Sequence, residues 1–248
     1  MFISNILSGI GRYVLLLRSA LARPEKFSMY YKETIRQMDS VGVGSAFIVV
    51  MISLFIGAVT AVQFADQLGD SFVPNYYIGY IVRDIAIIEM APTITCLVLA
   101  GKVGSNMAAE IGGMRQKEHI DAMEIMGVNT AAYLIMPKII AAVVMIPMLV
   151  AISAFISVIG GYAATVFTGT ISHAEYELGV RSFFQERYVV IMFVKSAVFA
   201  FLLTSVSCYQ GYYVKGGSIE LGQASTRSVV LSMVLILLFD YLLAVLLT

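Results

Sequence analysis

Five long apolar segments constrain the fold of this chain more than any other feature. They cover residues 45–66, 78–106, 131–168, 188–211 and 227–247. The second carries Arg83, Asp84 and Glu89 and the fourth carries Lys195, but the runs are otherwise mostly apolar, as in "AFIVVMISLFIGAVTAV" (Ala46–Val62). The strands of an outer-membrane β-barrel would instead alternate apolar and polar residues. A helix needs roughly 20 apolar residues to cross a bilayer. The sequence therefore predicts an all-α membrane protein with five transmembrane helices.

The composition agrees with this class and argues against several others. The chain is 59% hydrophobic and only 13% charged, whereas a soluble domain is about a quarter charged. The formal net charge is zero, so nothing indicates a nucleic-acid partner. Cys96 and Cys208 lie inside apolar runs and are interpreted as small hydrophobic residues. His119 and His173 are not expected to form a metal site, and no cofactor is expected in this chain.

The third apolar segment is predicted to form one helix rather than a hairpin. From Ile139 to Phe167 it contains no charged residue and would measure roughly 43 Å as a helix. Two spans would need about 40 residues and a turn. A single tilted helix, bent near Pro147, fits this length better.

The basic residues predict the orientation in the membrane. With a cytoplasmic N-terminus, twelve lysines and arginines fall inside, three fall outside, and Lys195 lies within a span. The inside group is Arg12, Arg18, Arg23, Lys26, Lys32, Arg36, Lys102, Arg115, Lys117, Lys138, Lys215 and Arg227, and the outside group is Arg83, Arg181 and Arg187. Cytoplasmic loops are enriched in these residues, so the N-terminus is predicted inside and the C-terminus outside.

Residues 1–40 precede the membrane region, 41–248, of what we predict to be a single domain, 1–248. Apolar residues recur at helical spacing between Ile3 and Leu17, and Arg12 and Arg18 lie off this stripe. This pattern is typical of a helix in the plane of the membrane interface, here followed by a linker. A helix packed beneath the spans is the alternative.

A charged amphipathic stretch separates the second and third spans. Gly112-Gly113 predicts a break, and the residues from Met114 to Met126 favour a new helix. Its polar face contains Lys117, Asp121 and Glu124, and its apolar face contains Ile120, Ala122, Met123 and Met126. The sequence predicts either a short helix that binds a partner or an ordinary solvated helix.

Residues suited to capping define the end of this helix and the start of the next. Gly127 is a good C-cap, because glycine adopts the left-handed conformation without strain. Asn129 or Thr130 can cap the N-terminus of the third span.

Three charged residues, Glu89, Lys195 and Asp240, fall away from the ends of the predicted spans. Each costs roughly 2.5–3.5 kcal/mol at the bilayer centre, so such residues normally face a partner or a wet cavity. Lys195 is predicted to pair with Glu89 or with Asp240. Two interpretations remain open: the charges guide a lipid headgroup, or they form a structural ion pair.

The second span and the stretch that follows it resemble the MlaE-like ABC transporter permeases, the Mce-associated, YrbE/TGD-type family. The similar region is "EMAPTITCLVLAGKVGSNMAAEIGGMRQKEHIDAMEIMGV" (Glu89–Val128). The segments "FIGAVTAVQ" (55–63), "GGSIELGQASTRSVV" (216–230) and "FDYLLAVLL" (239–247) extend the resemblance over nearly the whole chain. The chain departs from the family pattern at three positions. Ile88 replaces an Arg found in some members, Lys102 replaces the usual Arg, and His119 replaces the usual Gln.

The resemblance implies the membrane subunit of an ATP-driven phospholipid transporter in the inner membrane. It implies a second copy of this chain, a cytoplasmic ABC ATPase dimer that binds ATP and Mg²⁺, and a periplasmic MCE-domain protein, and it leaves open a small accessory cytoplasmic subunit. This chain would not be an enzyme. The alternatives are a proton- or ion-coupled carrier that uses Glu89, Lys195 and Asp240, and a scaffold without transport.

The resemblance also assigns roles to particular residues. "DAMEIMGVNTAAYLIMP" (121–137) looks like the loop whose coupling helix docks on the ATPase. The residues assigned to this coupling helix are Met114, Arg115, Glu118, Ile120, Asp121, Met123, Glu124 and Gly127. Met114, Ile120 and Met123 would fill a groove of the ATPase. The lipid cavity between two copies would be lined by the last span and by Gly57, Ala61, Gln63 and Phe64.

Overall fold

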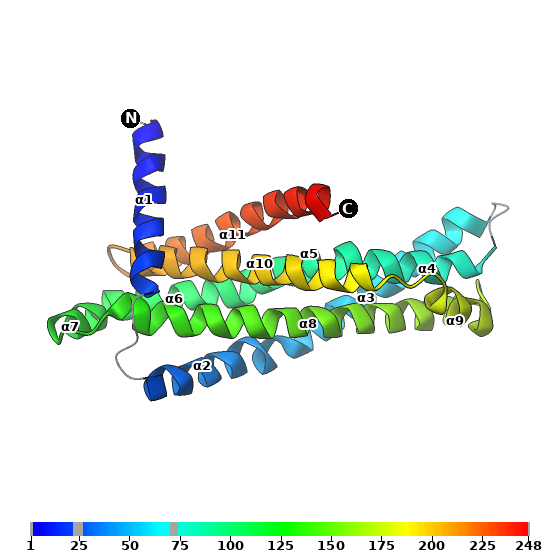
Figure 1. The fold of residues 1–248 in the computed structure, drawn as a ribbon, viewed down its shortest axis with the longest axis horizontal. Coiled ribbons are helices and arrows are strands. Elements are labelled where there is room, and N and C mark those ends of the chain that lie inside the picture. The colour runs from blue at the N-terminus through cyan, green and yellow to red at the C-terminus, as the bar shows by residue number, and fades with distance from the viewer. Residues whose placement is uncertain (1, 22–26, 70–73, 248) are drawn as a thin grey trace.

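The computed structural model describes residues 2–21, 27–69 and 74–247, and the regular secondary structure of this part of the chain is helical throughout (Figure 1). The predicted all-α class is confirmed. The α-helices are α1 (Phe2–Ala20), α2 (Phe27–Val41), α3 (Val43–Gly69), α4 (Tyr76–Ile85), α5 (Ala91–Leu99), α6 (Ser105–Gln116), α7 (His119–Ile125), α8 (Thr130–Thr168), α9 (His173–Arg181), α10 (Glu186–Tyr212) and α11 (Ser218–Leu247). Two π-helical segments, η1 (Ala86–Met90) and η2 (Ala100–Gly104), lie between them.

Within the described residues, five helical segments are long and apolar enough to cross a membrane. They are Tyr30–Leu68, Tyr76–Gln116, Thr130–Thr168, Glu186–Tyr212 and Ser218–Leu247. Each contains one predicted span. The first is longer than expected, because α2 forms where a linker was predicted and leads directly into α3.

The third segment is one helix, as predicted. α8 lies along the long axis of the molecule, with α7 at one end and α9 at the other (Figure 1). It runs unbroken past Pro137 and Pro147, and the side chain of Asn129 caps it by accepting a 3.2 Å hydrogen bond from the Ala132 amide. The cap therefore falls on the first of the two predicted residues.

α3 packs on α8 with close backbone contact. A Cβ atom on Gly57 would lie 1.8 Å from the carbonyl oxygen of Ser157, and one on Gly160 would lie 2.2 Å from that of Leu54. Small residues allow such approaches between helices in a membrane. Both glycines are therefore needed for this contact.

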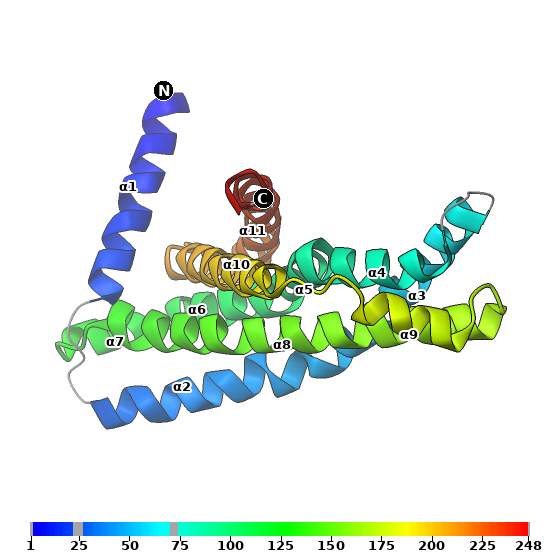
Figure 2. The same cartoon turned by 45° about the vertical axis from the view of Figure 1, so that its right-hand side comes forward.

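The N-terminal helix α1 points away from the bundle, across its long axis, near the end that carries α7 (Figures 1 and 2). Leu16 and Ala20 are buried against the bundle, whereas Leu7, Ile10 and Val14 are exposed. If the bundle spans the membrane, this direction places α1 in the interface plane, as predicted. The side chains of Ile3 and Ile6, and all of Arg23 and Lys26, lie outside the described residues.

Candidate functional site

The three charged residues within the spans meet in one cluster. The Lys195 Nζ atom lies 2.8 Å from Glu89 Oε2 and 2.7 Å from Asp240 Oδ1. These residues come from α10, η1 and α11, so the cluster joins three membrane segments. The sequence predicted one or the other pair, and the structure contains both.

The members of this cluster differ in exposure. The Lys195 side chain is 1% exposed and that of Asp240 is 11% exposed, whereas that of Glu89 is 45% exposed. Two carboxylates surround one ammonium group, so the cluster carries one excess negative charge when all three are ionised. The accessible part of this charge is on Glu89.

The backbone at Glu89 is unusual. Glu89 lies in η1, where the helix widens by one residue, and Lys195 also approaches the Ile88 carbonyl oxygen at 3.4 Å. Short π-helical segments inside α-helices frequently occur at functional sites. In the described part of the chain, no group of three or more His, Cys, Asp or Glu residues is placed to hold a metal ion.

The turn between the second and third spans differs from its prediction. Gly112-Gly113 does not break the helix, because α6 continues to Gln116. A Cβ atom on Gly112 would lie 2.4 Å from Leu221 Cδ1, so this glycine makes room for the start of α11. The chain turns instead at Glu118, whose φ is 59°. The predicted helix from Met114 to Met126 is therefore wrong in its bounds, since Met114 and Arg115 belong to α6.

The inward and outward residues of this turn also differ from the prediction. Ile120 is 0% exposed and packs among Ile111 and Ile135 of its own chain, so it cannot fill a groove of another protein as predicted. Met114 and Met123 are half-buried against the same cluster. The exposed apolar residues are Ile125, at 88%, and Met126, at 71%.

Polar contacts hold the turn against two spans. Arg115 lies 2.9 Å from Asp121 and 3.6 Å from Glu124, and its guanidinium group lies over the ring of Tyr212. Glu124 accepts hydrogen bonds from the hydroxyl groups of Thr130 and Tyr212 at 3.2 and 3.1 Å. Arg115 and Asp121, both assigned to the coupling helix, bind each other and remain partly exposed.

The ends of the turn follow their predictions more closely. Gly127 has a φ of 81° just after α7, which confirms it as the glycine that ends this helix. Glu118 is exposed at the N-cap of α7. Glu118 is therefore accessible to a partner.

The residues predicted to line a lipid cavity do not form one surface. Gly57 is buried against α8, and Ala61 is fully buried beside Gly161. Neither can line a cavity between two copies, and this part of the prediction is wrong. Phe64 is half-buried in a cluster with Ile78 and Tyr176, and Gln63 is exposed.

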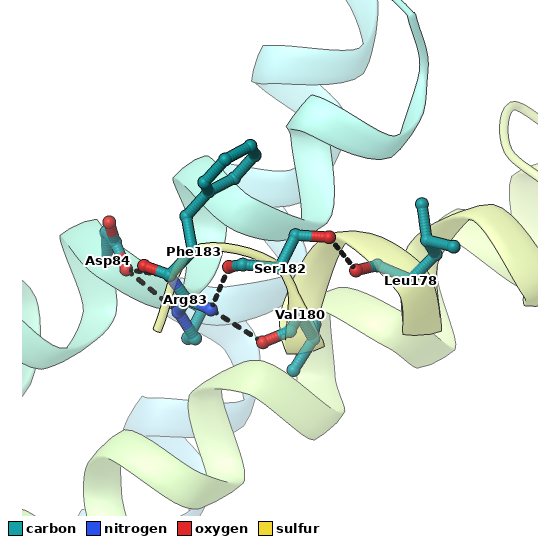
Figure 3. A network of polar contacts seen from close by, with 6 residues as sticks. All are labelled: Arg83, Asp84, Leu178, Val180, Ser182 and Phe183. Atoms are coloured by element: carbon teal, nitrogen blue, oxygen red, sulfur yellow. Dashed lines mark hydrogen bonds and ion pairs between the residues drawn. The ribbon is translucent and has the colours of Figure 1, made fainter. Parts of the chain in front are cut away.

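Arg83, which the sequence placed near the outer start of the second span, is buried in a polar network between α4 and α9 (Figure 3), at the end of the bundle opposite α7 (Figure 1). Arg83 donates to Asp84 Oδ1 from Nε and Nη2, at 2.8 and 2.6 Å. Its Nη1 atom donates to the carbonyl oxygens of Val180 and Ser182, each at 2.7 Å. Arg83 therefore fixes the C-terminal end of α9 to α4. The adjacent Arg-Asp pair in an apolar segment was the available sequence signal.

The fold and the charge cluster define a polytopic α-helical membrane protein. A family model described as "Permease MlaE" matches residues 34–246, and the chain belongs to this permease family. A probable ABC transporter permease protein of Rickettsia bellii (strain RML369-C) is 32% identical over an alignment of 253 positions, with coverage of 96% of this chain and 96% of the relative.

Two further relatives carry more specific names. The intermembrane phospholipid transport system permease protein MlaE of Haemophilus influenzae is 29% identical over 235 residues, with coverage of 94% of this chain and 90% of the relative. The chloroplastic protein TRIGALACTOSYLDIACYLGLYCEROL 1 of Arabidopsis thaliana is 27% identical over 226 residues, with coverage of 88% and 62%.

Proposed function

We propose that this chain is the membrane subunit of an ATP-driven transporter that moves phospholipid between the inner membrane and a periplasmic MCE-domain partner. The match to the permease family over residues 34–246 carries this proposal, and the name of the Haemophilus influenzae relative supports phospholipid as the substrate. The chain itself catalyses no reaction. A separate ATPase dimer binds ATP and Mg²⁺, and a small accessory cytoplasmic subunit can join the complex. In the membrane, the N-terminus of this chain is cytoplasmic and its C-terminus is periplasmic.

The turn around α7 is the proposed contact with the ATPase. It lies at one end of the molecule and exposes Ile125 and Met126 beside Glu118. The Arg115–Asp121 pair and the buried Ile120 fix it to the spans. A push on this turn would therefore move α6 and α8 together, which is what coupling ATP binding to a lipid cavity requires.

The lipid cavity is proposed to lie between two copies of this chain, along α11. Only 17% of the most apolar part of α11 is buried within the chain, which leaves a long apolar face for lipid or a second copy. This exposed face includes Val230, Val234, Leu237, Tyr241 and Val245. Of the four first-span residues predicted to line this cavity, only Gln63 is exposed.

The decisive experiment is native mass spectrometry of the protein purified mildly from its own membranes. Two copies with two ATPase subunits, an MCE-domain protein and bound phospholipid are expected. Reconstitution in liposomes then tests whether phospholipid transfer to the MCE-domain partner requires ATP. A chain that never co-purifies with an ATPase would contradict the proposal.

The charge cluster supports a second candidate, a proton- or ion-coupled carrier. Its observation is the half-exposed Glu89 beside Lys195, within a span. Transport that follows a proton gradient in liposomes without any ATPase would favour this candidate. Transport that follows ATP and ignores the gradient would exclude it.

A further inference from the structure

A polar cavity of about 340 Å³ lies near the end of the bundle where α1 joins α10 and α11. Arg12 of α1, Lys215 of the α10–α11 connection and Arg227 of α11 line it, together with Tyr209 and Tyr213. It is far in sequence from Glu89 and from α7, and neither contributes to its lining. Its volume is within the range of pockets that bind small molecules.

The charge of this cavity is unbalanced. Three basic side chains face one lining carboxylate, Glu220. That carboxylate accepts a 2.8 Å hydrogen bond from the Gly217 amide, which partly offsets its negative charge. Among the residues that the structure describes, none of the three basic side chains forms an ion pair. The lining therefore carries a net positive charge on three exposed side chains, which favours an anionic ligand.

The position of the cavity indicates what kind of anion reaches it. α1 carries exposed apolar residues, Ile10 and Val14, next to Arg12, as expected of a helix lying in the interface. Tyrosines are enriched at the level of lipid headgroups, and the rings of Tyr209 and Tyr213 contact each other here, 5.2 Å apart. Basic pockets between membrane helices on the cytoplasmic side bind phosphate-bearing headgroups.

We propose that this cavity binds a phosphate group, as carried by the headgroup of an anionic phospholipid or by a free phosphate. Guanidinium groups bind phosphate oxygens through paired charge-assisted hydrogen bonds, and Arg12 and Arg227 supply two guanidinium groups. Lys215 adds a third charge, and the Tyr213 hydroxyl group can donate to an ester oxygen. The Tyr209 hydroxyl group donates instead to the Gly9 carbonyl oxygen, at 3.3 Å, and so ties α1 to α10 beside the cavity. This proposal does not depend on transport. Only the assignment to the cytoplasmic leaflet depends on the proposed orientation.

The test uses the full-length, delipidated protein in detergent and native mass spectrometry with phosphatidylglycerol or phosphatidylcholine as the added lipid. We expect at least tenfold tighter binding of phosphatidylglycerol. The triple variant Arg12→Gln, Lys215→Gln, Arg227→Gln should lose about fivefold in affinity for each charge removed, and so all of this preference. The matched control Arg18→Gln, Lys32→Gln, Lys117→Gln removes three exposed charges outside the cavity. It should retain the preference for phosphatidylglycerol. Equal losses in both triple variants would overturn the proposal.

A gain-of-affinity variant guards against misfolding as the explanation. Glu220→Gln removes the one lining carboxylate, and its amide oxygen can still accept from Gly217. It should bind phosphatidylglycerol about fivefold more tightly than the parent. Unchanged or weaker binding would count against the site.

Competition by inorganic phosphate identifies the source of the phosphate group. Displacement of phosphatidylglycerol by millimolar phosphate means that the cavity recognises the phosphate group alone and binds a soluble ligand. Failure of phosphate to compete, with the lipid preference intact, means that glycerol and acyl chains contribute and that the ligand is the lipid. No binding of either probe would exclude the site.

Discussion

The buried ammonium group of Lys138 in α8 lies 2.5 Å from the Glu110 carboxylate in α6, just before the chain turns into α7. The two partners are unequal, because the Lys138 side chain is 3% exposed and that of Glu110 is 42% exposed. Removal of the carboxylate leaves a buried ammonium group without its counter-ion, whereas removal of the lysine leaves a carboxylate that water can reach.

This inequality predicts different costs for the two single substitutions. Glu110→Ala should lower the free energy of unfolding by about 3 kcal/mol, and Lys138→Met should cost clearly less. The double variant should resemble Lys138→Met rather than the sum of both. Unfolding of the purified protein by denaturing detergent measures all three, and equal costs for the two single variants would contradict the assignment.

The glycines of the chain should respond to substitution according to their surroundings. Gly57→Ala places a methyl group 1.8 Å from the Ser157 carbonyl oxygen, which would force α3 and α8 apart. We expect a loss of a few kcal/mol in stability, in line with overpacking of a well-packed core. Gly113→Ala is the control, since nothing lies within 4 Å of the added atom, and it should be neutral or slightly stabilising. Thermal unfolding of both variants in detergent provides the comparison.

Local patterns in the sequence were sufficient for the spans and for the helix ends. Long, mostly apolar runs predicted all five membrane segments, and the residue types at Asn129 and Gly127 marked two ends. A pairing of Lys195 with Glu89 or with Asp240 also followed from the sequence, because an intramembrane lysine needs a carboxylate and few are present. That Lys195 pairs with both was seen only in the structure. These predictions depend on residue type and spacing alone.

The errors have a common cause, namely contacts between residues far apart in the chain. Gly112 looked like a helix breaker, but it is a small residue required by Leu221. Ile120 looked like an outward apolar face, but the bundle covers it. Gly57 and Ala61 were assigned to a lipid cavity through the family resemblance, but α8 packs against both. A helical wheel gives the faces of a helix without telling which face the rest of the chain covers.

Substitutions in the charge cluster of Glu89, Lys195 and Asp240 should distinguish a role in transport from a role in folding. Asp240 is nearly buried beside Lys195, so Asp240→Asn should reduce both stability and yield. Glu89 is half-exposed, so Glu89→Gln should leave the yield almost unchanged while lowering lipid transport in reconstituted liposomes. Yield, thermal stability and transport rate are measured on the same preparations. Parallel losses of stability and transport in Glu89→Gln would instead assign this carboxylate to a structural ion pair.

Arg83 should be irreplaceable by lysine. Its guanidinium group binds Asp84 and the carbonyl oxygens at the end of α9 at the same time, and a single ammonium group cannot reproduce this geometry. Arg83→Lys and Arg83→Met should therefore both increase proteolysis or hydrogen exchange between Val180 and Phe184. Arg181→Lys is the control, because the Arg181 side chain is largely exposed and forms an ion pair along α9 with Glu177. Protection restored to the parent level in Arg83→Lys would show that charge alone suffices.

The turn at α7 offers the sharpest test of coupling to an ATPase. Ile125→Asp with Met126→Asp places two charges on exposed positions, so folding should be preserved while ATPase binding is lost. Ile120→Ala acts in the opposite way, because it empties a fully buried position and should cost about 2–5 kcal/mol of stability. Co-purification with the ATPase, thermal stability and ATP-dependent lipid transfer are measured for each. If the double aspartate variant binds the ATPase like the parent, the contact lies elsewhere, and the exposed Glu118 side of the turn becomes the next surface to reverse in charge.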